Sequence, residues 1–353
     1  MSSRERLVHI DGLRGLAVLL MVMVHAAATW APSSPADPTL LSYMVSGLGG
    51  LAAPLFVALL GWGAFQRPRA WAERWRQAAF LLGCQLVVNL SAPHLFDPFT
   101  PGVLSLMGLL VLTQPWWGYQ WNKLTPSANM ALFTVQLLLL MTLLEPFQAP
   151  SEWDIRVSTP SLEVFASHLL LTGTYPLIPW VFFASFGATM ATHQRGSATT
   201  PVLAKTFTAG LFMSLILLLY ALRTNRTWAL PTGDALLTFF PANIPFLVAA
   251  LTGVALLWLL SSTKEVFSGL SALGQVSLTV YVAHFLPFVW LYQLGVRLGW
   301  SVTASILATA AYTAAWVVLG TLWHLHARRW SLESLLRRWT GRTAGHVRSM
   351  EAE

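Results

Sequence analysis

An arginine and a histidine share one face of the first apolar stretch, RGLAVLLMVMVH (residues 14–25). His25 follows Arg14 by eleven residues, so at about 100° per residue the two side chains point to within roughly 20° of the same direction on a helix. A rise of about 1.5 Å per residue separates them by about 16 Å, too far for direct contact. Asp11 precedes Arg14 by three residues. We therefore predict an Asp11–Arg14 ion pair at one end of the helix and a separate imidazole further along it.

A second histidine, His284, lies in another apolar stretch, SLTVYVAHFLPF. Tyr281 precedes it by three residues and Ser277 by seven, so the three polar side chains share a helix face. An imidazole inside an apolar helix has two interpretations. It lines a cavity, where it can act as a general acid or base, or it forms a hydrogen bond between helices. The same alternatives apply to His25, and Arg14 is either a ligand for an anion or an anchor at the membrane edge.

Three residues outside these stretches are weaker candidates. His168 and His94 lie nearer the predicted outer surface, where we expect mainly structural roles. Trp180 ends the segment TYPLIPW, whose two prolines fix φ and remove two backbone donors, which indicates a helix start or a break. Broken backbone at membrane depth is tolerated only inside protein or beside a water-filled cavity. Despite the structural role expected for His168, we include His168 and Trp180, with His284 and Tyr281, among the candidate substrate-binding residues.

The segment RPRAWAERWR (residues 67–76) is both basic and aromatic. Such a segment either anchors the chain at the membrane interface or lies beside an anionic cofactor. Arg67 and Arg69, together with Arg14, are the candidate cofactor-binding residues.

The composition identifies the class of protein. Of the 353 residues, 55% are hydrophobic and only 10% are charged, whereas a soluble domain carries about 25% charged residues. Apolar runs of roughly 17–25 residues, without a two-residue alternation, predict membrane helices rather than a β-barrel. The single cysteine, Cys84, excludes a disulfide framework and a thiolate metal cluster, and we expect no metal. The sequence contains no nucleophile elbow, phosphate loop or H-E-x-x-H motif.

We predict an all-α membrane protein with about ten transmembrane helices, or eleven if the segment after Pro160 is a separate broken or re-entrant piece. The predicted spans are residues 13–29, 42–65, 76–91, 101–116, 127–145, 174–192, 203–221, 242–261, 272–293 and 302–325. Residues 1–326 would form one polytopic membrane domain. Residues 327–353 would form a basic cytoplasmic tail, in which ARRWSLESLLRRW has the pattern of an amphipathic helix lying on the membrane surface.

The basic residues are distributed unevenly over the segments between these spans. Most lysines and arginines fall on the side of the N-terminus, whereas the other side holds only Arg156, Arg223, Arg226 and Arg297. The positive-inside rule therefore predicts cytoplasmic N- and C-termini and an external loop at residues 146–160. The net charge of +7 reflects this topology. The expected partner is the lipid bilayer, and we expect no nucleic acid.

Several segments resemble integral membrane acyltransferases. IDGLRGLAVLLMVMVH (residues 10–25) has the arginine, ten-residue gap and histidine of the acyltransferase-three family. GLAAPLFVALLGWGAF, TPGVLSLMGLLVL and TYPLIPWVFFASFGA are more similar to bacterial relatives of heparan-alpha-glucosaminide N-acetyltransferase, and LGQVSLTVYVAHF resembles a late span of the whole superfamily. The W-S-L-x-x-E stretch typical of acyltransferase-three proteins is absent, which favours the N-acetyltransferase side. However, Ser105 and Leu106 stand where those relatives commonly have Gln-Arg.

The resemblance implies that an acyl group, most often acetyl, passes from cytoplasmic acyl-CoA to a hydroxyl or amino group of a glycan, amino sugar or lipid headgroup on the outer side. It implies catalytic roles for His25, Asp11 and Arg14. Arg14 would serve the anionic donor or orient Asp11, and His25 would act as general base or form a transient acyl-imidazole. His284 would orient the acceptor or share the proton. The resemblance also implies a multi-pass protein of a bacterial-type inner membrane and leaves room for a homodimer.

A proton-coupled transporter of a small polar or anionic substrate is the main alternative, because broken helices and buried histidines also suit transport. The lack of an internal repeat counts against it. A non-catalytic membrane partner is a third alternative, and it would show neither turnover nor CoA binding.

Overall fold

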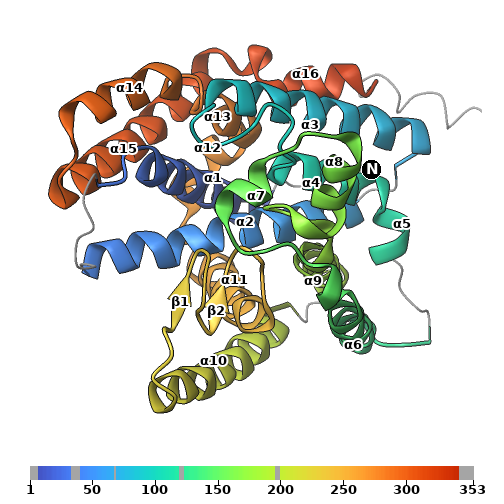
Figure 1. Cartoon of the computed structure of the whole chain (residues 1–353). Coiled ribbons are helices and arrows are strands. Elements are labelled where there is room, and N and C mark those ends of the chain that lie inside the picture. The colour runs from blue at the N-terminus through green and yellow to red at the C-terminus, as the bar shows by residue number, and fades with distance from the viewer. Residues whose placement is uncertain (1–6, 33–39, 67–68, 119–122, 195–198, 342–353) are drawn as a thin grey trace, which may run out of the picture.

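A computed structural model describes residues 7–32, 40–66, 69–118, 123–194 and 199–341, which are predominantly helical (Figure 1). This confirms the all-α class. The first half contains α1 (Val8–Thr29), α2 (Leu40–Gln66), α3 (Trp71–Ser91), α4 (Val103–Leu112), α5 (Gln114–Trp117), α6 (Pro126–Leu144), η1 (Glu145–Phe147), α7 (Trp153–Val157), α8 (Leu162–Ser167) and the π-helical η2 (His168–Thr172). The second half contains α9 (Leu177–Gln194), α10 (Thr199–Arg223), β1 (Ala229–Leu230), β2 (Leu237–Thr238), α11 (Ile244–Lys264), η3 (Ser268–Leu270), α12 (Ser271–Gly274), α13 (Ser277–Ala283), α14 (Phe288–Leu298), α15 (Val302–His326), η4 (Arg328–Trp330) and α16 (Leu332–Trp339).

Helix α1 is the centre of the bundle. It contacts α2, α11, α12, α13 and α15, and α2 in turn packs along α9 (Figure 1). Two short glycine contacts bring α2 and α9 together. A Cβ at Gly61 would overlap the Ala184 carbonyl, and one at Gly187 would overlap the Ala58 carbonyl. Small residues at such crossings allow close backbone packing between membrane helices, as the glycine-rich sequence of α2 predicts.

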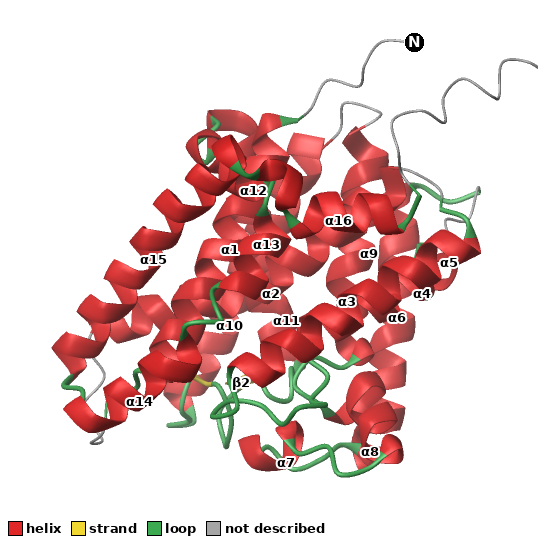
Figure 2. Ribbon diagram, turned by 90° about the horizontal axis from the view of Figure 1, so that it is seen from above, coloured by secondary structure: helices red, strands yellow, loops and turns green. Residues whose placement is uncertain are grey.

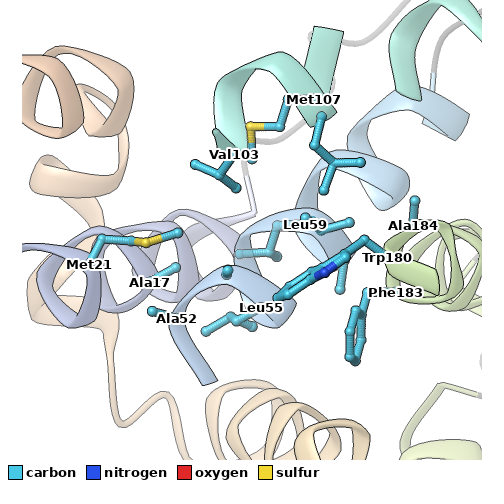
Figure 3. Packing of buried hydrophobic residues seen from close by; sticks show 14 of the residues in the cluster. Ala17, Met21, Ala52, Leu55, Leu59, Val103, Met107, Trp180, Phe183 and Ala184 are labelled. Carbon is cyan, nitrogen blue, oxygen red and sulfur yellow. The ribbon is translucent and has the colours of Figure 1, made fainter. Parts of the chain in front are cut away.

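The buried side chains around this crossing come from four helices. Figure 3 shows residues of α1, α2, α4 and α9 interdigitating, among them Ala17, Met21, Ala52, Leu55, Leu59, Val103, Met107, Trp180, Phe183 and Ala184. This packed layer holds α1 in a fixed position, and α1 carries three of the candidate site residues.

The structure does not confirm the number of about ten transmembrane helices. Six described helices are long and apolar enough to cross a membrane, and there are up to eight if each of two bent helix pairs counts as one span. One pair joins 162–172 to 177–193 with a bend of 48°, at the predicted proline break, and is a broken span or a re-entrant loop. The predicted spans at 76–91 and 101–116 correspond to α3 and α4. Helix α3 carries charged residues in its first turns and Gln85 and Asn89 on its buried face, and α4 has only 10 residues.

The bundle has two distinct ends, which we name by the helices found there. Phe267 and Leu270 touch α1 at Gly12 and Gly15, so the loop before α12 lies beside the first turns of α1. Figure 2 shows α12 near one end of the molecule and α7 and α8 near the opposite end. Under the predicted topology, the α12 end is cytoplasmic and the α7 end is external, and this orientation stays a prediction.

The segment after α15 packs against the bundle. Helix α16 contacts α3 and α13, and the indole N–H of Trp339 donates to the Arg76 carbonyl at 3.1 Å. The carboxylate of Glu333 accepts hydrogen bonds from the backbone N–H of Leu278 at 2.6 Å and from the hydroxyl of Thr279 at 2.7 Å. Burial raises the pKa of Glu333, and these bonds oppose that rise. Glu333 thus fixes the first turn of α13. The separate tail domain at 327–353 stays a prediction, and residues 342–353 lie outside the described part of the chain.

Candidate active site

His25 of α1 and His284, directly after α13, meet although 259 residues separate them in the sequence. Nδ1 of His25 lies 3.0 Å from Nε2 of His284. The ring planes are 14° apart and the ring centroids 5.2 Å apart, so the two imidazoles are nearly coplanar and meet edge to edge at this contact. Exposed fractions of 9% for His25 and 0% for His284 show that the pair is buried. The structure therefore brings together the two intramembrane histidines that the sequence singles out.

One arrangement of protons satisfies both neutral rings. Nδ1 of His284 lies 3.1 Å from the Val280 carbonyl oxygen, which can only accept, so we assign the proton to this nitrogen. Nε2 of His284 then holds a lone pair and accepts from Nδ1–H of His25. The lone pair of His25 is consequently on Nε2, to which no side chain or backbone group of the described residues is hydrogen-bonded. This arrangement fits a base that acts through Nε2 of His25.

Aromatic side chains enclose the histidine pair. The Phe285 ring centroid lies 4.5 Å from that of His25 and 4.2 Å from that of His284, and Phe285 is fully buried. Tyr281 lies edge-on to both imidazoles, at 6.1 and 5.6 Å. The predicted neighbour Tyr281 is thus beside the pair. Such walls exclude water, and a low local dielectric strengthens every electrostatic interaction inside them.

Arg14 and Asp11 form the predicted ion pair. Nη1 of Arg14 lies 3.0 Å from Oδ1 of Asp11, whose side chain is 4% exposed, whereas that of Arg14 is 33% exposed. The Arg14 guanidinium also lies over the Trp62 ring of α2, 6.0 Å from its centroid. A partly exposed guanidinium in this setting can still receive an anion. The pair lies near the start of α1, more than two helical turns before His25.

The basic segment before α3 is described only in part. Arg67 lies outside the described residues. Arg69 is partly buried, and Trp71 and Trp75 are exposed at the start of α3. The Arg74 guanidinium lies over the Trp71 ring, 5.3 Å from its centroid. The cofactor-binding roles of Arg67 and Arg69 stay predictions.

His168 has a structural setting at the α7 end. Its Nε2 lies 3.1 Å from the Ile155 carbonyl oxygen and 3.0 Å from that of Ser158, so this nitrogen carries the proton. Its Nδ1 accepts from the Thr172 hydroxyl at 2.8 Å. These bonds join α7 to the π-helical turn η2. The predicted substrate-binding role of His168 stays a prediction.

Arg156 binds the same turn from α7. Its side chain is completely buried, and it donates to the carbonyls of Thr172 at 2.9 Å, Gly173 at 3.2 Å and Ala149 at 2.7 Å. Burial lowers its pKa to about 10, so the group is still charged at neutral pH. Arg156 therefore donates hydrogen bonds to backbone carbonyls at the break before α9, where a continuous helix would supply N–H donors. The sequence places it in a polar loop and gives no signal of this role.

We expect Arg156→Lys to lower the unfolding temperature of the purified protein by several degrees. An ammonium cannot reproduce the planar fork, so buried carbonyls lose donors, at a cost of about 1–3 kcal/mol. The matched control is Arg226→Lys, because Arg226 is exposed and pairs with Asp234 at 3.4 Å, an interaction worth little at a surface. Equal melting temperatures for wild type and Arg156→Lys would show that this fork is not needed.

Trp180, a predicted substrate-binding residue, is fully buried in α9. Within the described residues, its ring contacts are with Tyr175, Phe183, Phe239 and Phe246, at centroid distances of 5.0 to 5.9 Å. The structure thus gives Trp180 a packing role, and its contact with a substrate stays a prediction.

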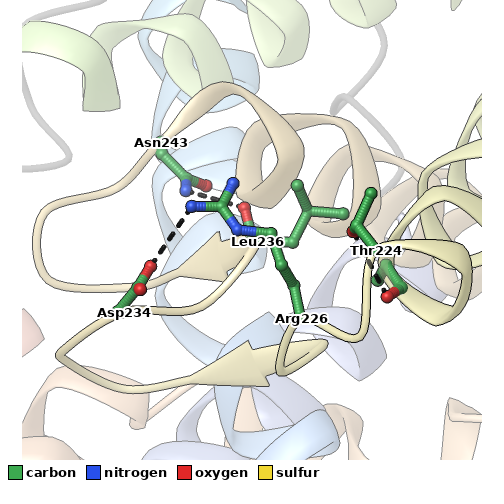
Figure 4. Close-up of polar contacts among 6 residues, drawn as sticks. Thr224, Arg226, Asp234, Leu236 and Asn243 are labelled. Carbon is green, nitrogen blue, oxygen red and sulfur yellow. Dashed lines mark hydrogen bonds and ion pairs between the residues drawn. The ribbon is translucent and has the colours of Figure 1, made fainter.

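The connection between α10 and α11 presents Phe239 to this aromatic cluster. Asn243 donates to the Leu236 carbonyl at 2.9 Å (Figure 4). Its Oδ1 accepts from the Phe246 N–H at 3.0 Å, which caps α11. The Arg226–Asp234 pair lies in the same loop (Figure 4). This connection also contains the short parallel β1–β2 pairing.

A second polar contact lies one helical turn beyond His25. The Thr29 hydroxyl lies 3.2 Å from Nε2 of His94, and the His94 ring stacks on Tyr292 with centroids 4.1 Å apart. Burial lowers the pKa of His94 to about 4, so the ring is neutral at neutral pH. Sequence reasoning missed Thr29 and Tyr292. The spacing of four residues between His25 and Thr29 was the available signal.

The apolar helices, the bundle around α1 and the buried histidine pair define a multi-pass α-helical membrane protein with a polar centre. The model of the acyltransferase-three family, described as an acyltransferase domain, matches residues 7–324. The chain therefore belongs to this family of membrane acyltransferases. A search of curated proteins gives no match.

Proposed function

We propose that this protein moves an acyl group, typically acetyl, from cytoplasmic acyl-CoA to a hydroxyl or amino group on the outer side of a bacterial-type inner membrane. The observation that carries the proposal is the His25–His284 pair, which leaves Nε2 of His25 as the basic nitrogen. The family match supports acyl transfer as the reaction class. A glycan, amino sugar or lipid headgroup is the proposed acceptor.

In the direct route, Nε2 of His25 takes the proton of the acceptor hydroxyl, or of an amine that has already released its ammonium proton to solvent, as the acceptor atom attacks the thioester carbonyl. The new C–O or C–N bond forms and the C–S bond breaks. The departing CoA thiolate then takes the proton from Nε2–H of His25, which restores the neutral ring. His284 acts through Nδ1 of His25: its lone pair orients the ring and stabilises the positive charge that develops on it.

A two-step route uses the same nitrogen. Nε2 of His25 would attack the thioester, release the CoA thiolate and form an acyl-imidazole. The acceptor would then attack the acyl carbon, the C–N bond to Nε2 would break, and the proton of the acceptor would balance the CoA thiolate as the thiol. Label on the protein when acyl-CoA is supplied without acceptor would favour this route over the direct one.

Arg14 serves the donor in this proposal. It lies near the α12 end and is partly exposed, as contact with the anionic phosphates of CoA requires. The acyl end of the donor must then extend along α1 for about 16 Å to reach His25. Arg67 and Arg69 would contribute further positive charge at the same end, and Asp11 would hold the Arg14 guanidinium in place.

We expect Arg14→Lys to raise the KM for acyl-CoA more than it lowers kcat, because the charge remains but the planar fork is lost. Arg14→Ala should weaken CoA binding further and leave the buried Asp11 carboxylate without this partner. Calorimetric titration of CoA onto both variants measures the effect. If both bind CoA like wild type but have lost turnover, Arg14 takes part in the chemistry and the proposed division of roles along α1 is wrong.

The proposed direction of transfer requires the α7 end to be external. In a Cys84→Ser background, Ser151→Cys should react with a membrane-impermeant thiol reagent in intact cells. Glu265→Cys, exposed in the loop after α11, should react only after the cells are opened. The reverse labelling pattern would invert the orientation and the direction of transfer.

The test of the function uses purified protein, radiolabelled acetyl-CoA and an extract of envelope glycans and lipids. We expect a labelled product, or labelled protein if the two-step route operates. Uptake of a solute by reconstituted vesicles without transfer of label would instead identify the transporter alternative. The labelled product would also test the closer relationship to bacterial relatives of heparan-alpha-glucosaminide N-acetyltransferase, which predicts an amino-sugar acceptor.

A further inference from the structure

His284 lies at a break between two helices. Helix α13 ends at Ala283 and α14 begins at Phe288, and the two are bent by 45°. Pro287 lies inside the break and has no N–H with which to continue the hydrogen-bond ladder. In a continuous α-helix the His284 carbonyl would accept from the N–H of Phe288, but this N–H donates to the Phe285 carbonyl at 3.0 Å instead. The break therefore removes the usual helical donor of the His284 carbonyl.

Tyr312 of α15 supplies a replacement donor. Its hydroxyl donates to the His284 carbonyl oxygen at 2.6 Å. The Tyr312 ring is held between Trp30, at a centroid distance of 5.2 Å and nearly perpendicular, and Phe288, at 5.4 Å. The hydroxyl thus reaches the broken backbone from a ring that packs against two other aromatic side chains.

Besides the helical bond from its own backbone N–H to the Val280 carbonyl at 3.0 Å, His284 makes three further hydrogen bonds. Tyr312 holds its carbonyl, the Val280 carbonyl holds Nδ1, and Nε2 meets Nδ1 of His25. Of these three, only the bond from Tyr312 comes from a residue that belongs neither to the histidine pair nor to α13. Without the bond from Tyr312, the peptide group of His284 could shift. The imidazole of the same residue, which orients His25, would then move with it.

We propose that Tyr312 is a positioning residue for acyl transfer, which acts through the backbone of His284 on the orientation of the His25–His284 pair. This inference rests on the proposed function. Tyr312 makes no contact with the substrate in this account. It prevents the broken α13–α14 segment from relaxing and so keeps Nε2 of His284 opposite Nδ1 of His25.

The test is Tyr312→Phe, which keeps the ring packing and removes only the hydroxyl. We expect kcat for acyl transfer to fall about tenfold, as expected for the loss of one well-formed hydrogen bond. The KM for acyl-CoA should stay within twofold and the unfolding temperature within about 2 °C of wild type. Tyr220→Phe is the control, because Tyr220 is 51% exposed on α10, and its kcat should not change.

A double-mutant cycle separates positioning from a general structural role. In a His284→Ala background, adding Tyr312→Phe should change kcat less than twofold, because the residue through which Tyr312 acts no longer has its imidazole. A tenfold loss in both backgrounds, or no loss in either, would overturn the proposal for Tyr312. If wild type transfers no acyl group in the same assay, the proposed function fails, and the role of Tyr312 fails with it.

Discussion

His25→Ala should lower the rate of acyl transfer by about 10²–10⁴-fold, the range expected for loss of a general acid–base group. Nε2 of His25 is the basic nitrogen of the buried pair, whereas the lone pair of His284 is on Nε2, which faces the Nδ1 side of the His25 ring and not the nitrogen proposed to act on the acceptor. Initial rates with acetyl-CoA and an acceptor extract measure the effect. The unfolding temperature and CoA binding should stay close to wild type, because Ala is compatible with α1 and Arg14 is unchanged.

The control for this variant is His326→Ala, an exposed histidine at the end of α15. Its transfer rate should equal that of wild type. A His25→Ala protein that retains activity within a few-fold of wild type would reject His25 as the catalytic base. A protein that no longer binds CoA would instead assign His25 to the donor site.

The second large effect is expected from His284→Ala, which should lower kcat about 10- to 100-fold with little change in KM. The variant removes the lone pair that orients Nδ1–H of His25 and stabilises the charge on the ring, a role that partners of functional imidazoles commonly have. Measurement of kcat and KM on purified protein separates this effect from a loss of binding.

His284→Gln gives a sharper comparison. The amide oxygen of Gln can occupy a position near that of Nε2 of His284 and accept from Nδ1–H of His25, so this variant should be more active than His284→Ala. Equal activities of the two variants would mean that the hydrogen bond to His25 contributes nothing, and that His284 acts in another way.

The local features of the site were predictable from the sequence. The three-residue spacing of Asp11 and Arg14 predicts their ion pair, and the structure confirms it at 3.0 Å. The glycine-rich sequence of α2 predicts close packing, which occurs at Gly61 against Ala184. The first prediction depends on spacing within one helix and the second on residue size, and both properties can be read from a single sequence.

The meeting of the two histidines was not predictable in the same way. The sequence identifies His25 and His284 separately, but their contact depends on the break at Pro287 and on how α13 packs beside α1. The donor to the His284 carbonyl comes from Tyr312, a residue without any motif around it. Long-range contacts of this kind follow from the tertiary arrangement and have no local signal.

In two segments the structure shows polar contacts that the hydropathy pattern does not predict. The tail segment WSLESLLRRW has the pattern of a surface helix, and Glu333 within it is partly buried and accepts hydrogen bonds from the backbone of α13. The hydropathy of residues 76–91 also predicted a span, whereas the buried face of α3 contains Gln85 and Asn89. Their side chains bond to each other at 2.8 Å and Asn89 to the Thr100 carbonyl. Polar side chains can be buried when they have hydrogen-bond partners of this kind, and the sequence alone does not identify those partners.

The most direct test of the account uses membrane vesicles in which the cytoplasmic face is outward and the native acceptor is enclosed. Acetyl-CoA labelled in the acetyl group is added outside to vesicles containing wild type, His25→Ala or His326→Ala. We predict that wild type and His326→Ala transfer label to enclosed material that resists washing, whereas His25→Ala does not. Equal labelling by all three, or no labelling by wild type, would contradict acyl transfer across the membrane at the His25–His284 pair.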